Sequence, residues 1–350
     1  SDMTTRNKYV NLLLTSVVAL FIGAVIMLVL GHNPIEAYIQ LFRGAFVGKL
    51  NLGTTLQKFL PLLLTAMAFA VAARAGVFNV GVEGSMYLGA ISAAWVGFTF
   101  SSLPGVVIIV FAILIASIVG ALWSAIPGSL RAGLEVNEVC STILLNYVAI
   151  HITSYLVNGP LSGKTGVPQT PPIAEGAKLT QFLRPSQAHT GLFIGIVVVI
   201  LLIWIMNRST IGYRLTSIGF NAKHAEYVGI NPKKGILLAF LMSGAIGGLT
   251  GGLEVLGTYG YFLGGFSAGI AFDGMLASLI VKNDIKMVPF MAFFLSVLKA
   301  GALGMERYTG VPKSIVDMII AIFIIFATME TLFAFLQKRK KRVTAIDESV

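Results

Sequence analysis

The chain has 350 residues, of which 56% are hydrophobic and 11% charged, with a mean hydropathy of +0.86. Soluble domains carry about 25% charged residues, so this composition excludes a soluble protein and predicts an all-α polytopic membrane protein. The net charge of +10 comes without a basic stripe interleaved with aromatic residues, so no nucleic acid is expected as a partner. The single cysteine, Cys140, and scattered histidines predict neither a disulfide framework nor a metal site.

About ten apolar segments are long enough, or nearly so, to cross the hydrocarbon core of a bilayer. In chain order they are 9–30, 55–73, 80–100, 104–126, 139–157, 191–206, 235–256, 267–281, 287–303 and 312–336. The third, seventh and eighth of these segments are short or interrupted by glycine, and the glycines of the seventh are suited to close contact with another helix. The sequence therefore predicts one transmembrane domain over 1–350 that is surrounded by membrane lipid.

Basic residues set the expected orientation, because Lys and Arg gather in cytoplasmic connections. Arg6 and Lys8 precede the first segment, and a basic tail at 337–350 follows the last. An even number of spans places both groups on the same side, whereas an odd number separates them. The sequence predicts that the N-terminus and the C-terminus are both cytoplasmic.

Two connections between the segments are long. The connection 158–190 contains five prolines and is expected to form an extracytoplasmic loop. The connection 207–234 is expected on the cytoplasmic side. The stretch 34–47 has apolar residues at helical spacing and predicts a helix at the outer membrane surface.

The segment 76–90 carries polar residues where a spanning helix would carry Leu and Val. An ionisable residue at bilayer depth, here Glu83, is a candidate for function. If the helix is continuous, Asn79 lies four residues earlier on the same face, and Phe78 supplies an aromatic ring nearby. The alternative is close helix packing through the glycines, with Glu83 bonded to a neighbouring helix.

Polar residues also mark the start and the interior of the fifth segment. Asn137 is suited to cap a helix, and Glu138 is suited to its positive end. Asn146 lies about two turns deeper, where its amide requires a partner.

The connection 207–234 contains a predicted short helix. Asn221 is a good N-cap and Gly229 a good residue for the C-terminal end. Ala222 and Ala225 fall on one face between them, and such a small-residue face allows another protein to approach closely. The alternative is a helix lying on the membrane surface, which favours large apolar residues on one side.

The stretch 159–165 resembles a phosphate-binding loop but has three residues instead of four between its glycines. It also follows a spanning segment rather than a strand. We therefore expect no ATP hydrolysis by this chain and, since no nucleophile–base or metal constellation is visible, no enzymatic activity.

Three motifs, 76–90, 136–147 and 209–231, together resemble the membrane subunits of bacterial ABC importers of the ribose, branched-chain amino acid and vitamin B12 class. The combination of the first two is similar to the nucleoside-transporting branch. The resemblance implies the type II import fold, with two related five-helix halves at about 9–157 and 191–336. Ser85 departs from the pattern, in which Gln is expected.

The resemblance also implies partners and site residues. The partners are a second related permease, a cytoplasmic ATPase that holds ATP and Mg²⁺, and an extracytoplasmic substrate-binding lipoprotein at a bacterial plasma membrane. Asp273 in the second half is a candidate counterpart of Glu83, and the alternative is a carboxylate bonded to the backbone near the eighth segment. The implied substrate-pathway residues are Phe78, Asn79, Glu83, Asn146, Phe262 and Asp273. The implied ATPase-docking residues are Gly212, Arg214, Gly219, Asn221, Ala222, Ala225 and Gly229.

Rival functions remain open at this point. Within the class, the chain is alternatively a permease for a simple sugar or another small metabolite. Outside it, an ion-coupled secondary transporter would use Glu83 and Asp273, but the motif at 209–231 argues against that class.

Overall fold

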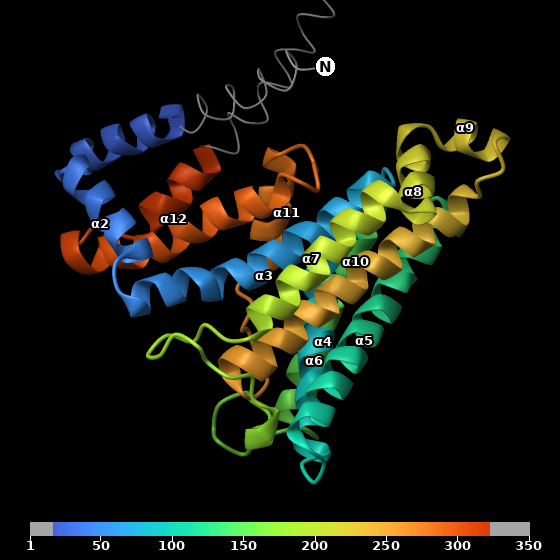
Figure 1. The fold of residues 1–350 in the computed structure, drawn as a ribbon, viewed down its shortest axis with the longest axis horizontal. Helices are drawn as coiled ribbons and strands as arrows, with labels where there is room; N and C mark the ends of the chain where they lie inside the picture. The colour runs from blue at the N-terminus through green and yellow to red at the C-terminus, as the bar shows by residue number, and fades with distance from the viewer. Residues whose placement is uncertain (1–16, 323–350) are drawn as a thin grey trace, which may run out of the picture. The chain divides into compact units, whose positions relative to one another are not determined.

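The computed structural model describes residues 17–322 of the chain, and within them α-helices are connected by loops (Figure 1). Isolated β-bridges join Gln169 to Leu263 and Gln181 to His189. Two compact units are distinguished. The first comprises the described residues 17–47 and 297–322, and the second comprises 48–296. The division falls within the long helix α12, Val288–Thr309.

Six helices of the described part are long and apolar enough to span a bilayer. They are α3 (Lys49–Arg74), α5 (Gly105–Leu134), α6 (Glu138–Asn158), α7 (Gly191–Arg208), α10 (Pro232–Glu254) with its π-helical extension Val255–Tyr259, and α12. The helices Val17–Val29 and α2 (Pro34–Phe46) satisfy the same test only as a pair, bent by 120°. The chain is therefore a multi-pass membrane protein by length and composition.

Two expected spans have a different character. The segment 80–100 becomes the shorter helix α4 (Val82–Thr99). Most residues of α4 are buried, and the helix is not among those apolar enough to span a bilayer by composition. The segment 267–281 becomes the short apolar helix α11 (Ile270–Ile280). The first and tenth segments lie partly outside the described residues. The organisation into about ten spans and two related halves stays a prediction.

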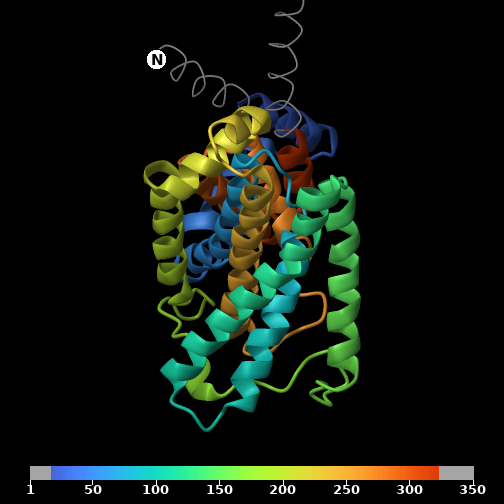
Figure 2. The ribbon, with the colours of Figure 1, turned by 90° about the vertical axis from the view of Figure 1, so that its right-hand side faces the viewer.

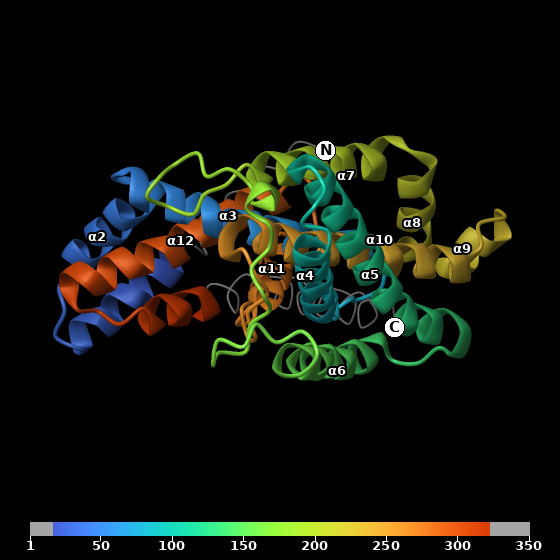
Figure 3. The same cartoon turned by 90° about the horizontal axis from the view of Figure 1, so that it is seen from below.

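The larger unit is built around α4, α5 and α10, which lie side by side (Figure 3). Their contacts are made through small residues. A Cβ atom added to Gly248 on α10 would overlap the carbonyl oxygen of Ala116 on α5 and lie 3.0 Å from the Cα atom of Gly120. The sequence expected such close contact from the glycines of this segment, and the structure confirms it.

The loop 159–190 is tied to the chain that follows α10. Thr170 donates its backbone N–H to the carbonyl of Phe262 at 3.0 Å, and the N–H of Gly264 donates to Pro168 at 2.8 Å. Figure 2, in which α6 is the green helix, shows the loop leaving the end of α6 and passing the ends of α4 and α5. This loop therefore fixes the segment 260–264, which leads towards α11.

The smaller unit contains the bent helix pair and the later part of α12. Tyr38 on α2 donates its hydroxyl to the carbonyl of Leu20 at 2.5 Å. A Cβ atom added to Gly44 would lie 2.6 Å from the Cα atom of Gly304, so these helices also meet through glycine. Lys299 and Asp317 form an ion pair at 3.9 Å.

The connection 207–234 holds two helices where the sequence predicted one. Helix α8 (Thr210–Phe220) begins directly after α7, with the hydroxyl of Ser209 accepting a hydrogen bond from Gly212 N at 3.3 Å. Helix α9 (Ala222–Tyr227) is the predicted short helix. The sequence analysis missed α8 because its Gly and Thr residues weaken the helical pattern.

Candidate functional site

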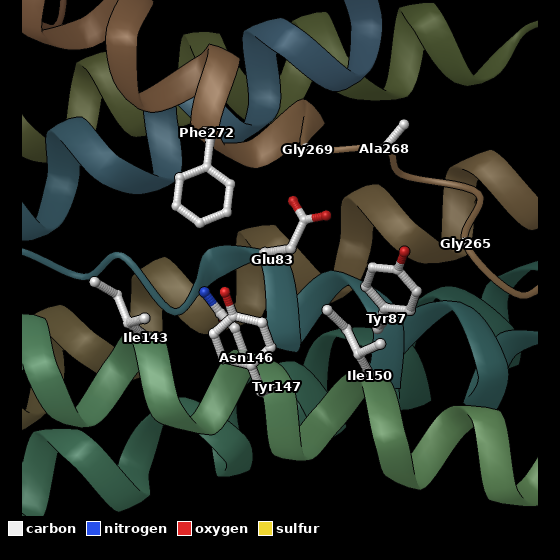
Figure 4. A pocket seen from close by; sticks show the side chains of 10 residues that line it. All are labelled: Glu83, Tyr87, Ile143, Asn146, Tyr147, Ile150, Gly265, Ala268, Gly269 and Phe272. Atoms are coloured by element: carbon white, nitrogen blue, oxygen red, sulfur yellow. The ribbon is translucent and has the colours of Figure 1, made fainter.

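A cavity of about 330 Å³ lies in the larger unit between α4, α6 and the segment 265–272 (Figure 4). Its size is at the lower end of the range of small-molecule sites, about 300–1,000 Å³. The lining combines a carboxylate, an amide and several aromatic and aliphatic side chains. The lining residues are Glu83, Tyr87, Ile143, Asn146, Tyr147, Ile150, Gly265, Ala268, Gly269 and Phe272.

Glu83 lies in the first turn of α4 and is almost completely buried. Its Oε2 atom accepts a hydrogen bond from the backbone N–H of Ala271 at 3.0 Å. The hydroxyl of Ser267 and the backbone of Gly269 lie near this carboxylate. The negative charge thus faces the N-terminus of α11, where a helix presents unpaired N–H groups and a partial positive charge. Glu83 connects the wall 267–271 to α4.

Asn146 on α6 is buried, and both the oxygen and the nitrogen of its side-chain amide form hydrogen bonds. Its Oδ1 atom accepts from Gly84 N at 2.8 Å, and its Nδ2 atom donates to the carbonyl of Val80 at 2.9 Å. The expectation that this deep amide has a partner is confirmed. Asn146 holds α6 against the start of α4 while part of it lines the cavity.

Asn79 does not share a helix face with Glu83, because α4 begins only at Val82. The continuous helix assumed from the sequence is wrong at this point. Asn79 is fully buried and donates from Nδ2 to the hydroxyls of Ser243 at 2.9 Å and Ser124 at 3.3 Å. Its Oδ1 atom accepts from Gly81 N at 3.0 Å, so the residue shapes the turn before α4.

Ser85 belongs to the same polar cluster. Its hydroxyl lies 2.9 Å from that of Ser124 and donates to the carbonyl of Gly120 at 3.2 Å. The site is fully buried between α4 and α5. A short side chain therefore fits where the resemblance led us to expect Gln.

The other three predicted pathway residues do not line the cavity. The ring of Phe78 lies 5.7 Å from that of Phe69, measured between centroids. Phe262 is buried with its ring 6.3 Å from that of Tyr87, so it supports a lining residue from behind. Asp273 lies in the first turn of α11, beyond the wall that Glu83 holds.

The sequence analysis missed three aromatic residues of the lining: Tyr87, Tyr147 and Phe272. Tyr147 directly follows Asn146, and Phe272 directly precedes Asp273, so both stand next to residues that were singled out. Their position beside a polar residue was the feature of the sequence that could have identified Tyr147 and Phe272 as lining residues. Which helix face turns towards the cavity depends on packing that the sequence did not reveal.

The docking motif has the predicted local structure. Asn221 Oδ1 accepts from His224 N at 3.0 Å and caps α9. Gly229 has a φ of +83°, and the N–H of Ile230 donates to the carbonyl of Ala225 at 2.9 Å, which closes the C-terminal end. Both cap predictions are confirmed.

The predicted small-residue face is only partly exposed, since Ala222 and Gly229 are exposed and Ala225 is buried. Ala225 is 1% exposed and packs against this chain, because α9 folds back onto α8 and α10. Tyr227 and Phe220 are instead 89% and 87% exposed. The surface that α9 and the end of α8 offer to a partner therefore contains these two aromatic side chains together with Ala222.

The remaining motif residues lie on α8. Gly212 is buried against the end of α7, and a Cβ atom on Gly219 would overlap the carbonyl oxygen of Arg74. These glycines hold α8 close to α7 and α3, while Arg214 is exposed. Residues 17–322 contain no group of three or more His, Cys, Asp or Glu side chains suited to a metal ion.

These features define a helical multi-pass membrane protein with a cavity between its helices and three exposed aromatic residues, Tyr213, Phe220 and Tyr227, on a two-helix connection. Residues 51–328 match the family described as branched-chain amino acid transport system / permease component, and the chain belongs to this family. It is accordingly a permease component of a transport system and not an enzyme.

Several curated proteins are similar over nearly their full length. The guanosine ABC transporter permease protein NupP of Bacillus subtilis is 35% identical, over 94% of this chain and 96% of its own. The nucleoside ABC transporter permease protein NupB of Lactococcus lactis is 32% identical, over 95% and 94%. The glucose ABC transporter permease protein TsgB13 of Haloferax volcanii is also 32% identical, over 91% and 87%. No solved structure matches the chain.

Proposed function

We propose that this chain is a translocation subunit of an ATP-driven nucleoside importer in a bacterial plasma membrane. The similarity to the guanosine and nucleoside permeases over at least 94% of this chain carries the proposal. The cavity between α4, α6 and α11 agrees with it, because it combines fixed polar groups with aromatic side chains. In this proposal the chain provides a gated pathway and performs no covalent chemistry.

The partners follow from the same similarity. Bacillus subtilis and Lactococcus lactis each have a second similar permease, NupQ and NupC, which supports a pairing with a related permease. A cytoplasmic ATPase would hold ATP and Mg²⁺, and an extracytoplasmic lipoprotein would deliver the substrate. The proposal also keeps ten spans in two five-helix halves, with both termini cytoplasmic.

A sugar importer is the second candidate, because the glucose permease TsgB13 reaches the same 32% identity as NupB. Reconstitution separates the two. The complex is placed in proteoliposomes with its ATPase and binding protein, and uptake of labelled guanosine, uridine and glucose is measured. Uptake of nucleosides that requires ATP and survives collapse of the proton gradient is the expected result. Uptake of glucose alone would establish the sugar function, and uptake that follows the proton gradient at constant ATP would establish a secondary transporter.

The ATPase is expected to dock on α8 and α9. Tyr227 and Phe220 have the size and exposure typical of interface anchors, in which aromatic side chains fill pockets of the partner. Ala225 is a poor place to test docking because a larger side chain there disturbs this chain itself. The informative variant is Tyr227→Arg, which keeps α9 intact and changes only an exposed side chain.

We expect Tyr227→Arg to insert normally and to lose the ATPase during co-purification. Phe182→Arg in the loop 159–190 is the matched control, since it adds the same cation to another exposed aromatic position. Co-purification of the ATPase with Tyr227→Arg at the wild-type ratio would contradict the docking assignment.

A further inference from the structure

Two aromatic side chains line opposite sides of the cavity. Phe272 projects from the start of α11, and Tyr147 stands opposite on α6, with Glu83 between these elements (Figure 4). Phe272 is 39% exposed and Tyr147 is 61% exposed. By contrast, the ring of Tyr87 packs against Phe266 at a centroid distance of 5.0 Å. The cavity therefore contains rings that support its wall and rings whose surface stays available.

The amide and the carboxyl group of the cavity are already engaged with the backbone. Asn146 uses its oxygen on Gly84 and its nitrogen on Val80. Glu83 accepts from Ala271 N at 3.0 Å, and its carboxyl group also lies near Ser267 and Gly269. Figure 4 shows its carboxylate directed towards the segment that contains Ala268 and Gly269. These two groups keep little hydrogen-bonding capacity for a ligand, so the aromatic side chains, with the hydroxyls of Tyr87 and Tyr147, dominate what the cavity can recognise.

Glu83 also determines where Phe272 lies. The hydrogen bond to Ala271 N fixes the residue immediately before Phe272, and α11 begins one residue earlier, at Ile270. The carboxylate thus clamps the first turn of the helix that carries the ring. A change at Glu83 would move Phe272 relative to Tyr147 without removing either ring.

We propose that Phe272 and Tyr147 hold the base of a nucleoside between them, and that Glu83 is a positioning residue for Phe272. This inference rests on the proposed nucleoside importer. Every nucleobase has a π face, and stacking on an aromatic side chain is tolerant of base identity. The site accordingly accepts purine and pyrimidine nucleosides and discriminates against free sugars, which lack such a face.

Transport kinetics of the reconstituted complex test the inference. We expect Phe272→Ala and Tyr147→Ala each to raise KM for guanosine about tenfold, within the range reported for loss of one base–aromatic stack. Tyr147→Phe keeps the ring and should retain the wild-type KM. The controls are Phe290→Ala and Tyr155→Ala, which remove exposed aromatic rings from α12 and from α6 outside the cavity. Complex yield and basal ATPase activity should be unchanged in the two control variants, whose rings lie outside the cavity.

The outcomes separate this inference from the function on which it rests. If the wild-type complex imports no nucleoside, the proposed function itself is wrong. If the wild type imports nucleosides but both alanine variants keep the wild-type KM, the importer stands and the assignment of the base site is overturned. A rise in KM shared by the two controls would also overturn it, since the effect would then not belong to this cavity.

Photolabelling gives a second, structural readout. The complex is irradiated with 8-azidoguanosine during turnover, and labelled peptides are identified by mass spectrometry. Labelling of the peptides that contain Tyr147 or Phe272, suppressed by excess guanosine but not by glucose, is the expected result. Specific labelling confined to other helices would place the base elsewhere and overturn the inference.

Discussion

Two glycine-rich regions of the larger unit use glycine for opposite reasons. On α10, Gly244 and Gly248 lie where an added Cβ atom would overlap the backbone of α5. In the cavity wall, Gly265 and Gly269 have φ angles of +77° and +88°, and an added Cβ atom would meet nothing within 4 Å. The first region requires glycine because there is no room for a side chain, and the second requires it because the backbone is left-handed.

This difference separates a rigid part of the unit from an adjustable one. Interlocked backbones on α5 and α10 cannot shift without losing many contacts at once. The wall 265–269 has open space around its glycines, and its position depends on a few hydrogen bonds, including the one from Ala271 N to Glu83. We therefore expect substitutions in α10 to affect assembly and substitutions in the wall to affect transport.

The largest effect is expected for Gly248→Val. The new side chain would collide with the carbonyl oxygen of Ala116, and overpacking of this kind costs about 3 kcal/mol or more when the backbone has to move. The yield and the thermal unfolding midpoint of the purified complex should both fall sharply.

Gly133→Ala is the control for this prediction, because Gly133 is an exposed residue of α5 with no atom within 4 Å of the added Cβ. Alanine is favoured over glycine in a helix by up to about 1 kcal/mol, so this variant should be as stable as the wild type or slightly more stable. A Gly248→Val complex with unchanged yield and midpoint would show that the helices are not interlocked.

The next prediction concerns the junction between the two regions, where His189 packs against Gly257 just beyond α10. Burial lowers the pKa of this His to about 4 from the ordinary value of 6.5. Its protonation therefore favours the unfolded state. The stability is complete above pH 6.5 and declines as the pH falls from about 6.5 towards 4. The full loss over this interval is about 3 kcal/mol at most.

Thermal unfolding of the complex between pH 7.5 and 4.5 measures this loss. We expect His189→Gln, which is neutral throughout, to be less stable at pH 7.5 because the packing and the contact to Thr258 are changed, but to show a flatter pH profile below 6.5. Parallel profiles for the two proteins would show that another group causes the acid sensitivity.

A smaller effect on stability is expected for Gly269→Ala in the wall. The added methyl group has room, but a φ of +88° costs an alanine about 1–2 kcal/mol. The complex should assemble normally, while KM for the nucleoside rises because the start of α11 shifts. Gly269→Asn should lie between the wild type and the alanine variant, since Asn tolerates left-handed conformations better. Equal KM values for all three proteins would argue against an adjustable wall.

Much of the architecture could be predicted from the sequence, because apolar length and helix capping are local properties. The caps at Asn137 and Asn221 and the close packing of α10 are examples. The role of Asn79 could not be predicted, because it depends on where α4 begins. The burial of Ala225 depends on how α9 folds back, which no spacing within α9 reveals.

The cavity was still harder to predict from the sequence, because its lining comes together only through tertiary packing. Glu83 was singled out as an intramembrane acid, but its bond to Ala271 joins residues far apart in the sequence. Glu254 on α10 shows the same limit. This carboxylate is buried, its Oε1 atom has no hydrogen-bond partner within residues 17–322, and a π-helical turn follows it. The sequence analysis passed over Glu254 because it lies in an otherwise regular glycine-rich segment.

The last prediction concerns Glu83→Gln, which preserves shape but replaces the carboxylate with an amide. The amide oxygen can still accept a hydrogen bond from Ala271 N. The amide nitrogen is itself a donor and would face another donor, and the carboxylate charge at the N-terminus of α11 is lost. Removal of a buried charge offsets part of this cost. We expect a normal yield of complex, a nearly unchanged maximal rate and a KM for guanosine raised several-fold.

A second substrate distinguishes positioning from direct contact in this variant. If Glu83 bound the ribose directly through the 2′-hydroxyl, the wild type would discriminate strongly against 2′-deoxyguanosine, and Glu83→Gln would abolish that discrimination. If Glu83 only positions Phe272, the variant should raise KM for both nucleosides by the same factor, because the effects of the two changes are then independent. Glu175→Gln, at an exposed ion pair in the loop 159–190, should change neither value. The ratio of the two KM values in wild type and variant is therefore the measurement that decides what the buried carboxylate does.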